Sequence, residues 1–345
     1  MKTIRVLLAG LGTVNRGWLD VLVSKSSSLR DAGVQFVIVG VADSTGVAIH
    51  PRGFRPETLL GLKKEGKKVK ALEGFQQEMT TEKMPASCEA ELLIESTPAN
   101  LETAEPGYSA VKAALGKGMA VVLANKTPLV RGFDELRKLC RDHGARMAYS
   151  ATVCGGLPVV NVLQRDLRLA QVRRIRGIFN ATSNFVLREL GRGGTLEAAV
   201  REAQRLGAAE ADPSHDLHGH DTANKLYIIL KSIEGFEGSF SDIRITGIQN
   251  VTVRDLEAAR ERGSVIKLLA EAYREGDSWR LSVEPAELPE KSFLGGCEGW
   301  EMGFEIETDL YERICMKNYE ADPLGTSAAV MRDCLDVAGH PEGGR

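Results

Sequence analysis

Asp221 and Lys225 are the residues whose types and spacing point most directly to chemistry. They lie four positions apart in a stretch that also contains Leu226, Ile228 and Ile229. On a helix this spacing places the carboxylate and the ammonium group on one face, and the apolar neighbours indicate a largely buried helix. A lysine held in this way can pass a proton to or from a substrate, directly or through water. The pair therefore indicates an enzyme that moves protons.

A second lysine, Lys126, directly follows the strand-like residues 121–123. The carboxyl end of such a strand is where open α/β sheets bind their ligands. Lys126 is therefore a candidate active-site residue. The alternative is a solvent-exposed lysine at the start of a loop.

A glycine-containing turn, Gly10-Leu-Gly12-Thr13-Val14-Asn15, lies between a strand pattern and a helix pattern. In that context the glycines permit a tight turn and a close approach to a pyrophosphate, and the helix N-terminus offers N–H groups to the anion. Asn15 stands where a third glycine is usual, which alters how helix and strand pack. We predict that Gly10, Gly12, Thr13 and Val14 bind NAD or NADP. The alternative is a tight turn without a ligand.

Asp43 follows the second predicted strand, where a carboxylate would accept hydrogen bonds from the ribose of NAD and repel a 2′-phosphate. Arg52 is expected in the loop beyond it, where it could receive that phosphate instead. The choice between NAD and NADP therefore stays open, with NAD favoured weakly.

Three histidines, His215, His218 and His220, lie beside Asp216 and Asp221 and raise the question of a transition metal. Spacing by two or three residues in a loop or helix start does not bring all three imidazoles onto one face. A catalytic metal is therefore disfavoured at this position.

The elements that must position these residues alternate regularly in the first half of the chain. Strand patterns and helix patterns follow one another, and a loop or frayed helix end is expected at 26–33. This alternation is typical of an α/β fold, a Rossmann-like doubly wound parallel sheet. The predicted strands are 4–9, 34–41, 92–94, 120–123 and 146–149, and the predicted helices are 18–23, 107–116 and 133–140.

A second α+β domain is predicted after residue 150, where longer helical stretches mix with strand patterns at 279–284 and 304–308. We expect a dinucleotide-binding domain over 1–150 and a substrate-binding and dimerisation domain over 151–317. A C-terminal helix, about 318–345 with its clearest part at 326–337, is expected to pack back on the first domain. The basic run at 63–68 is typical of a solvated helix face.

The composition excludes several classes of protein. Lys and Arg number 44 against 47 Asp and Glu, so the net charge of −3 provides no footprint for nucleic acid or an anionic membrane. No apolar run approaches the ~20 residues of a membrane span. Six cysteines are scattered singly, which favours reduced thiols and a cytoplasmic location. The expected partner is a small-molecule substrate.

Four segments together resemble the homoserine dehydrogenase family, in order and in spacing, over roughly residues 1–235. The fourth is the most specific. They are Glu95-Ser-Thr-Pro-Ala-Asn100 with Ala104-Glu-Pro-Gly107; Ala124-Asn125-Lys126-Thr-Pro128; Tyr149-Ser-Ala-Thr-Val-Cys-Gly155-Gly156-Leu-Pro158 with Gly177-Ile-Phe-Asn180-Ala-Thr182-Ser-Asn184; and Glu210-Ala-Asp212-Pro213-Ser-His-Asp216-Leu-His-Gly219-His-Asp221-Thr-Ala-Asn-Lys225.

The resemblance implies an NAD(P)-dependent oxidoreductase of amino-acid biosynthesis (threonine and methionine) that interconverts L-aspartate 4-semialdehyde and L-homoserine. It makes Lys225 the proton donor and acceptor, Asp221 the residue that orients it, and Lys126 a second active-site lysine. Because the sequence stops at residue 345, we expect a short form without a regulatory domain. A homodimer that pairs through the sheets of the second domain is also implied.

The resemblance also assigns binding roles. Glu210 and Asp216 would hold the substrate ammonium group, although Asp212, Pro213 and Ser214 would equally form a helix cap, and both roles can hold at once. A sodium ion would be bound by backbone oxygens of Val153, Gly155 and Leu157, with Ser150 where the family usually has glutamate. The further implied residues are Asn180 and Thr182 for substrate, and Ser96, Thr97, Lys126 and Thr326 for cofactor.

Two departures from the family pattern keep alternatives open. Bulkier and charged residues replace most glycines of the family's C-terminal loop at 318–330, and Ala181 stands where the family prefers glycine. The alternatives are an oxidoreductase of the same fold for another small aldehyde or hydroxy acid, and a dinucleotide-binding protein without catalysis.

Overall fold

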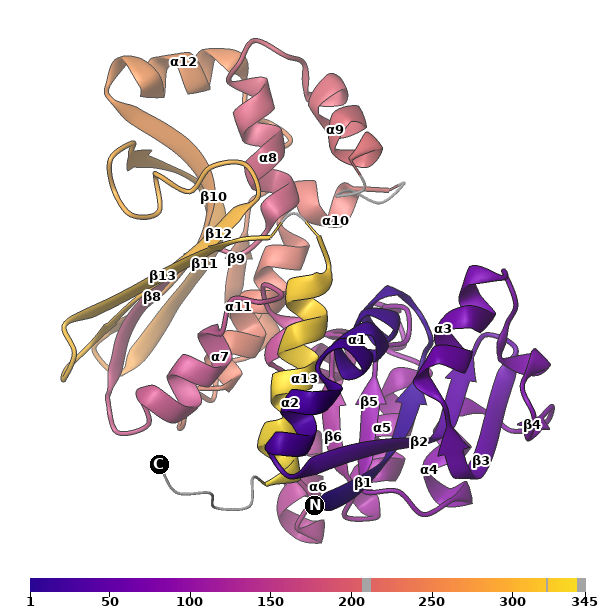
Figure 1. The fold of residues 1–345 in the computed structure, drawn as a ribbon. Helices are drawn as coiled ribbons and strands as arrows, with labels where there is room; N and C mark the ends of the chain where they lie inside the picture. Colours follow the sequence, from indigo (N-terminus) through magenta and orange to yellow (C-terminus); the bar gives the residue numbers. More distant parts are fainter. Residues whose placement is uncertain (207–211, 321, 340–345) are drawn as a thin grey trace. The chain divides into compact units, whose positions relative to one another are not determined.

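The structure, a computed structural model, describes residues 1–206, 212–320 and 322–339. The chain divides into two compact units, and each is described by itself (Figure 1). The first unit contains residues 1–156 and the C-terminal segment from 322, and the second unit contains residues 157–321.

A parallel sheet forms the centre of the first unit, in the order β2-β1-β5-β6-β7. Side chains on both faces of β1 are buried, among them Val6, Leu7 and Leu8, as expected for a strand with helices on both sides. The predicted Rossmann-like sheet is therefore confirmed. Its strands are β1 (Lys2–Ala9), β2 (Val34–Asp43), β5 (Leu92–Glu95), β6 (Ala120–Leu123) and β7 (Met147–Ala148).

Two antiparallel strands that the sequence patterns did not predict extend this sheet at the β2 edge. β3 (Gly46–Phe54) forms a hairpin with β2, in which Gly46 pairs with Asp43 and Phe54 with Ile38, and β4 (Phe75–Gln76) pairs with β3. The segment between them contains α3 (Pro56–Lys64) and a short 3-10 helix, η1 (Val69–Ala71).

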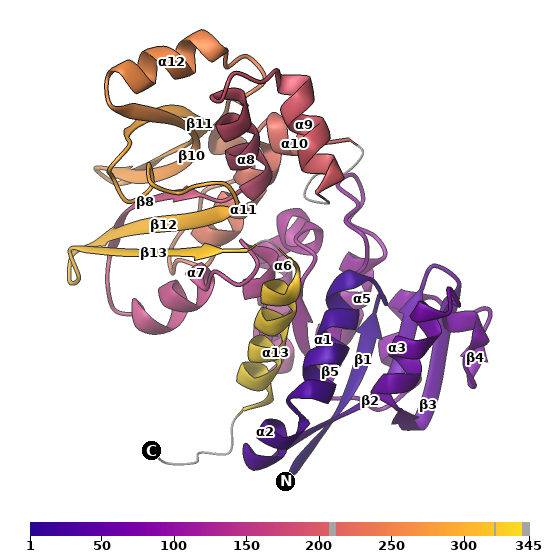
Figure 2. The same ribbon diagram turned by 45° about the horizontal axis from the view of Figure 1, so that its top comes forward.

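The helices of the first unit form two groups. α1 (Thr13–Ser24) contacts both α3 and α13 (Leu324–Ala338), whereas α5 (Gly107–Gly116) packs against α6 (Thr127–His143) (Figure 2). Residues 26–33, expected as a loop or frayed end, contain a helix of their own, α2 (Ser26–Asp31), whose Leu29 is buried in the core. The remaining short helices are η2 (Thr81–Lys83), α4 (Met84–Ser87) and η3 (Ser150–Thr152).

The second unit contains a six-stranded sheet in the order β13-β12-β8-β10-β11-β9. All neighbours are antiparallel except β11 and β9, which are parallel. The strands are β8 (Val172–Ile178), β9 (Ile243–Ile245), β10 (Ser264–Glu275), β11 (Ser278–Pro289), β12 (Glu301–Thr308) and β13 (Arg313–Tyr319).

Helices α8 and α11 of the second unit pack against β10. Residues 318 and 319, expected to begin the C-terminal helix, instead end β13, and α13 begins at Leu324. The helices are α7 (Val159–Asn161), the π-helix η4 (Val162–Asp166), α8 (Ala181–Leu190), α9 (Leu196–Arg205), α10 (Ser214–Leu217), α11 (His220–Lys231), η5 (Phe240–Asp242) and α12 (Val253–Glu261). In the described ranges, no helix combines the length and apolar character needed to cross a bilayer.

Candidate active site

Lys225 and Asp221 lie on α11 of the second unit and form an ion pair. Lys225 Nζ is 2.8 Å from Asp221 Oδ2 and donates a hydrogen bond of 2.7 Å to the carbonyl oxygen of Phe179. The side chains are only 15% and 8% exposed. Asp221 lies in the first turn of the helix, where the helix dipole favours a carboxylate. Two fixed contacts therefore hold the ammonium group in one place.

Asn180 joins this pair to a second carboxylate. Its Nδ2 donates hydrogen bonds of 2.7 Å to Asp216 Oδ1 and 2.8 Å to Asp221 Oδ2. Its Oδ1 accepts from the backbone N–H of Ser183 at 2.7 Å, so Asn180 is also the N-cap of α8. Because both ends of the amide are bonded, its orientation is fixed. The sequence paired Asp221 with Lys225 and suggested Asn180 and Asp216 separately, and the structure brings all four together.

The other predicted residues of the second unit have different surroundings, and one of them lies outside the described residues. Thr182 is buried in the first turn of α8. Glu210 lies outside the described residues. Asp212 Oδ1 accepts a 3.0 Å hydrogen bond from the backbone N–H of Ser214, so Asp212 supports the start of α10. His215 and His220 contact each other through their rings, and the described part of the chain contains no cluster of three or more potential metal ligands.

The glycine turn of the first unit is shaped to approach a ligand. Gly10 has a φ of +88°, and a Cβ there would lie 2.7 Å from the carbonyl oxygen of Ser96, so only glycine fits. A Cβ on Gly12 would meet nothing within 4 Å, which leaves open space above the turn. Gly12 is the N-cap of α1, and no side chain among the described residues caps the helix. The backbone N–H groups of the first turn, Thr13 and Val14 included, can therefore bind an anion.

Asn15, which replaces the usual third glycine, stabilises this turn from within. The side chain is fully buried, and Nδ2 donates a 2.7 Å hydrogen bond to the carbonyl oxygen of Gly10. The close helix packing occurs at Gly17 instead, where a Cβ would lie 2.2 Å from Ser327 Oγ of α13. Ser327 Oγ also donates to the carbonyl oxygen of Val14 at 3.1 Å. Its neighbour Thr326, a predicted cofactor residue, thus lies at the start of the helix that packs on α1.

Asp43, the predicted ribose-binding carboxylate, stabilises the turn after β2 through its own hydrogen bonds. Oδ1 accepts hydrogen bonds from the N–H and hydroxyl of Thr45 at 2.8 and 2.5 Å, and Oδ2 accepts from the N–H of Val69 at 3.0 Å. Beside it, Lys68 Nζ is 3.2 Å from Ser44 Oγ. The turn after β2 therefore presents both a carboxylate and a nearby ammonium group.

The expectation for Arg52 was wrong. Arg52 lies within β3, not in a loop, and its neighbour Phe54 pairs with Ile38 of β2. The Gly46 end of the hairpin is the end that lies at Asp43. Ile49 and Phe54 pair with Gly40 and Ile38, so Arg52 lies in a bulged part of the hairpin, level with residues 38–40 and about 10–17 Å from Asp43 at ~3.3 Å per residue.

The carboxyl ends of β5 and β6 carry a buried polar network that the sequence patterns did not identify. Glu95 Oε1 accepts hydrogen bonds from the N–H and hydroxyl of Thr97, and from Asn125 Nδ2 at 3.4 Å. Asn125 Oδ1 accepts from the N–H and hydroxyl of Thr127 at 3.0 and 2.9 Å. Lys126, half-buried at the N-cap of α6, is thus positioned by its neighbours on both sides. The sequence feature that could have revealed this network is a polar side chain at the end of each buried strand.

Burial raises the pKa of Glu95 to about 7, although hydrogen bonds from Thr97 and Asn125 lower it. Its Oε2 has no hydrogen-bond partner among the residues described, and neither has the buried hydroxyl of Ser96. With the open space above Gly12 and the uncapped N-terminus of α1, these groups fit a nicotinamide dinucleotide.

The predicted sodium segment turns sharply, since Cys154 and Gly155 both have positive φ angles, of 56° and 54°. Val153 and Leu157 are buried. Ser150, which departs from the family pattern, is bonded through its N–H and hydroxyl to Asp333 of α13 at 2.8 and 2.5 Å. A carboxylate therefore does reach this position, from α13.

Comparisons with known proteins agree on one family. The homoserine dehydrogenase family profile matches residues 158–335. The homoserine dehydrogenase of Methanocaldococcus jannaschii is 31% identical over 96% of this chain and 98% of its own. The NAD(+)-dependent homoserine dehydrogenase of Pseudomonas canavaninivorans is 28% identical, covering 98% and 97%. The crystal structure of a homoserine dehydrogenase from Thiobacillus denitrificans superposes with a TM-score of 0.83, at 30% identity, over 98% of this chain and 74% of that one.

These matches extend well beyond the segments that first suggested the resemblance, because they include α13 and nearly the whole chain. The chain belongs to the homoserine dehydrogenase family.

Proposed function

We propose that this protein interconverts L-aspartate 4-semialdehyde and L-homoserine with NAD or NADP. The observation that carries the proposal is a cluster of four residues, in which the Asn180 amide bridges the carboxylates of Asp216 and Asp221, and Asp221 pairs with the ammonium group of Lys225. The bound nicotinamide supplies or accepts the hydride. The residues of the chain bind and orient the substrate and move its proton.

Lys225 donates a proton to the alkoxide when the aldehyde is reduced and removes it when the alcohol is oxidised. Its contacts with Asp221 Oδ2 and the Phe179 carbonyl fix the position of Nζ, which general acid–base catalysis requires. Asp221 thereby acts as a positioning residue. Lys126, at the end of β6, is the second active-site lysine and polarises the substrate carbonyl.

Asp216, with Glu210, holds the ammonium group of the substrate. Asn180 orients Asp216 through a 2.7 Å hydrogen bond, and the hydroxyl of Thr182 contributes a further polar group on the same helix turn. Two carboxylates suit a cationic ammonium group because opposite charges attract and hydrogen bonds to charged groups are the strong ones.

The dinucleotide is bound by the first unit. Gly10, Gly12, Thr13 and Val14 bind the pyrophosphate at the N-terminus of α1, and Asp43 lies at the ribose. Ser96, Thr97, Lys126 and Thr326 lie toward the nicotinamide. The open space at Gly12 and the unpartnered hydroxyl of Ser96 support this placement.

Several further assignments belong to the same proposal. Residues 1–150 with the C-terminal helix form the dinucleotide-binding domain, and 151–317 form the substrate-binding and dimerisation domain. Backbone oxygens of Val153, Gly155 and Leu157 bind sodium. The protein is a homodimer, and the scattered cysteines support a cytoplasmic location.

The test is homoserine oxidation followed at the nicotinamide absorbance with NAD and NADP in parallel. Lys225→Met keeps the length of the side chain but cannot transfer a proton, so we expect kcat to fall by about 100-fold or more with dinucleotide affinity unchanged. Lys138→Met, at an exposed position of α6, is the matched control and should behave as wild type. The proposal fails if wild type binds dinucleotide but does not oxidise homoserine, or if Lys225→Met is fully active.

A further inference from the structure

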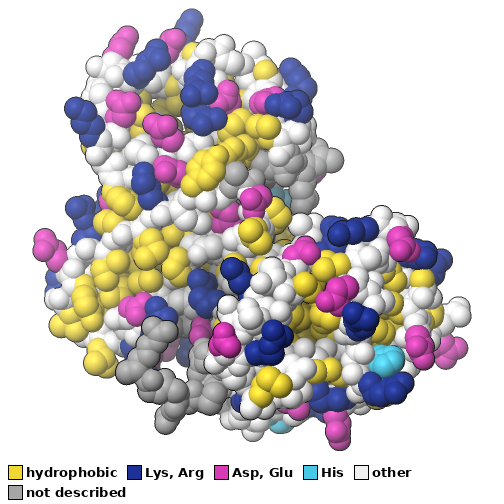
Figure 3. Space-filling view, in the orientation of Figure 1, with side chains coloured by type: hydrophobic (Ala, Val, Ile, Leu, Met, Phe, Trp, Pro, Cys, Tyr) yellow, Lys and Arg dark blue, Asp and Glu magenta, His cyan; other side chains and the backbone are white. Residues whose placement is uncertain are grey.

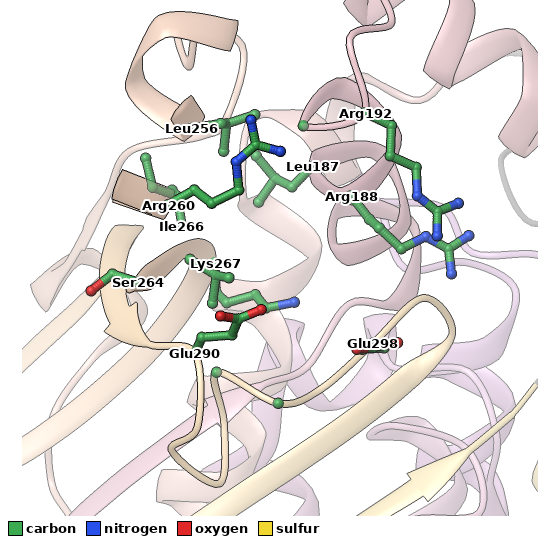
Figure 4. A pocket seen from close by; sticks show the side chains of 14 residues that line it. Leu187, Arg188, Arg192, Leu256, Arg260, Ser264, Ile266, Lys267, Glu290 and Glu298 are labelled. Atoms are coloured by element: carbon green, nitrogen blue, oxygen red, sulfur yellow. The ribbon is translucent and has the colours of Figure 1, made fainter. Parts of the chain in front are cut away.

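A second site candidate in the second unit is a cavity of about 300 Å³ at the far end of α8 (Figure 4). The C-terminal half of α8, α12, the first residues of β10 and the loop at 290–298 surround it. Asn180 caps the other end of α8, and ten helical residues span about 15 Å. The cavity is therefore separate from the proposed catalytic cluster.

The floor of the cavity contains a buried ammonium group. Lys267 is 7% exposed, and its Nζ donates hydrogen bonds to Asn184 Oδ1 at 2.8 Å and the Cys297 carbonyl at 2.5 Å. An ammonium group has three donors, and Lys267 forms no ion pair with any residue that the structure describes. Burial lowers the pKa of Lys267. Glu298 and Glu301 act on this charge only from beyond ion-pair distance, and a buried charge without a close partner is costly, so an anion entering the cavity would be stabilised there.

The mouth of the cavity adds one further positive charge that has no close partner among the described residues. Arg260 of α12 extends into the cavity (Figure 4), and in the described ranges it forms no hydrogen bond or ion pair through its guanidinium. Arg188 and Arg192 also line the cavity, but both are paired with Glu189, at 2.9 and 3.1 Å.

Two carboxylates, Glu290 and Glu298, lie at the exposed rim. Their negative charges repel a highly charged anion such as phosphate, but they repel an anion with a single charge much less.

The remaining wall is apolar. Leu187 of α8, Leu256 of α12 and Ile266 of β10 line it, and Leu187 is buried. About 300 Å³ is the lower end of the range of small-molecule sites. A ligand for this cavity therefore needs one carboxylate and a short aliphatic group.

We propose that this cavity binds a small aliphatic monocarboxylate. Its carboxylate accepts hydrogen bonds from Lys267 and Arg260, and its aliphatic group contacts Leu187, Leu256 and Ile266. The ligand can be a simple acid or an amino acid, because Glu290 and Glu298 accommodate an added ammonium group at the rim.

The experiment is isothermal titration calorimetry of the full chain with 3-methylbutanoate. We expect saturable binding, with no heat from 3-methylbutan-1-ol, which lacks the charge, and weaker binding of inorganic phosphate. A titration with L-leucine decides whether the ligand is an amino acid or a simple acid. If L-leucine binds more tightly than 3-methylbutanoate, the ligand is an amino acid. If it binds more weakly, the ligand is a simple acid. Failure of both 3-methylbutanoate and L-leucine to bind would overturn the proposal.

Two variants locate the binding. Arg260→Gln removes an exposed charge that supports nothing else in the fold and should weaken binding on the order of tenfold. Arg254→Gln, exposed on the same helix but outside the cavity lining, is the matched control and should bind as wild type. Leu256→Trp should fill the cavity and abolish binding. Binding that neither Arg260→Gln nor Leu256→Trp changes would place the ligand elsewhere and refute the site.

Discussion

Lys68 is an exposed lysine beside the predicted ribose-binding carboxylate, so we predict that it contacts the 2′-phosphate of NADP. Its Nζ is 3.2 Å from Ser44 Oγ, beside the carboxylate of Asp43. Three hydrogen bonds from Thr45 and Val69 already engage that carboxylate, which weakens its repulsion of a phosphate. At the scale of single residues, the structure therefore favours acceptance of NADP more than the sequence pattern did.

We predict that Lys68→Ala weakens NADPH binding about five- to tenfold, the worth of one exposed charge-assisted hydrogen bond, and leaves NADH binding unchanged. Lys70→Ala removes another exposed lysine of the same segment and serves as the control. Fluorescence titration of each variant with NADPH and NADH measures both affinities. Equal NADPH affinity in Lys68→Ala and wild type would show that Lys68 does not contact the phosphate.

The sequence predicted individual site residues well where spacing along one element decides the contact. Lys225 and Asp221 are four apart on a helix, so their ion pair follows from helix geometry. The bond between Asn180 and Asp216 joins residues 36 positions apart, and no periodicity reports such a contact. Arg52 failed for the same reason, because its distance from Asp43 depends on a hairpin register that the sequence pattern does not show.

At the scale of elements, the stability of the fold should depend on pH through a buried carboxyl group at the end of β5. Glu95 has a pKa of about 7 in place of the usual 4.5 because it is fully buried. The unfolded chain ionises this carboxyl above pH 4.5, whereas the folded chain resists ionisation up to about pH 7. Protonated Glu95 therefore makes its full favourable contribution to the free energy of unfolding below pH 4.5, and this contribution is lost as the pH rises through 7.

We predict that Glu95→Gln, which keeps the acceptor for Thr97 but cannot ionise, removes this part of the pH dependence. The variant should gain stability over wild type as the pH rises, reaching about 3 kcal/mol above pH 7 at ~1.4 kcal/mol per pKa unit. Glu73→Gln, at an exposed position, should follow the wild-type curve. Denaturant unfolding across this pH range provides the comparison, and parallel curves for Glu95→Gln and wild type would contradict the prediction.

Among the elements, the buried parallel strands were predictable because both faces are apolar and glycines or polar residues end them. β3 and β4 were not, since β3 contains His50, Pro51 and Arg52 and lies near the sheet edge, where no apolar run is required. α2 was missed because a single buried side chain, Leu29, anchors a helix of mostly polar residues. The hydrogen bond between Ser150 and Asp333 joins residues 183 positions apart. It was not predictable from the sequence because it depends on tertiary packing.

At the scale of the whole molecule, the β12–β13 hairpin carries apolar side chains that the described residues leave largely exposed. Leu310 and Tyr311 in the turn are 63% and 51% exposed, and Met316 and Tyr319 on β13 are 37% and 67% exposed. Figure 3 shows hydrophobic side chains gathered over this part of the sheet. Contiguous apolar surface of this kind marks interaction sites in soluble proteins, and it supports the proposed homodimer.

The neighbouring strands carry a half-buried cluster of charged side chains. Arg176 of β8 lies across the strands from Glu271 and Glu305, 3.7 and 3.5 Å from their carboxylates. Its buried Nε nevertheless lacks a hydrogen-bond acceptor within the part of the chain that is described. Buried donors in native proteins are nearly always satisfied, and because its own chain covers this atom, the unmet donor is a cost inside the fold.

We predict that the double substitution Leu310→Asp and Tyr311→Asp, in the turn of the hairpin, converts a dimer into a monomer. Two carboxylates in an apolar interface would lose their hydration without gaining a partner, and each such burial costs several kcal/mol. Both positions are exposed in the single chain, so the fold itself should persist, with an unchanged circular dichroism spectrum. Sedimentation equilibrium of wild type, the double variant and Val23→Asp, an exposed control on α1, measures the association. A monomeric wild type, or a double variant that remains dimeric, would show that the hairpin is not the interface, and the apolar surface of β13 would then need a different partner.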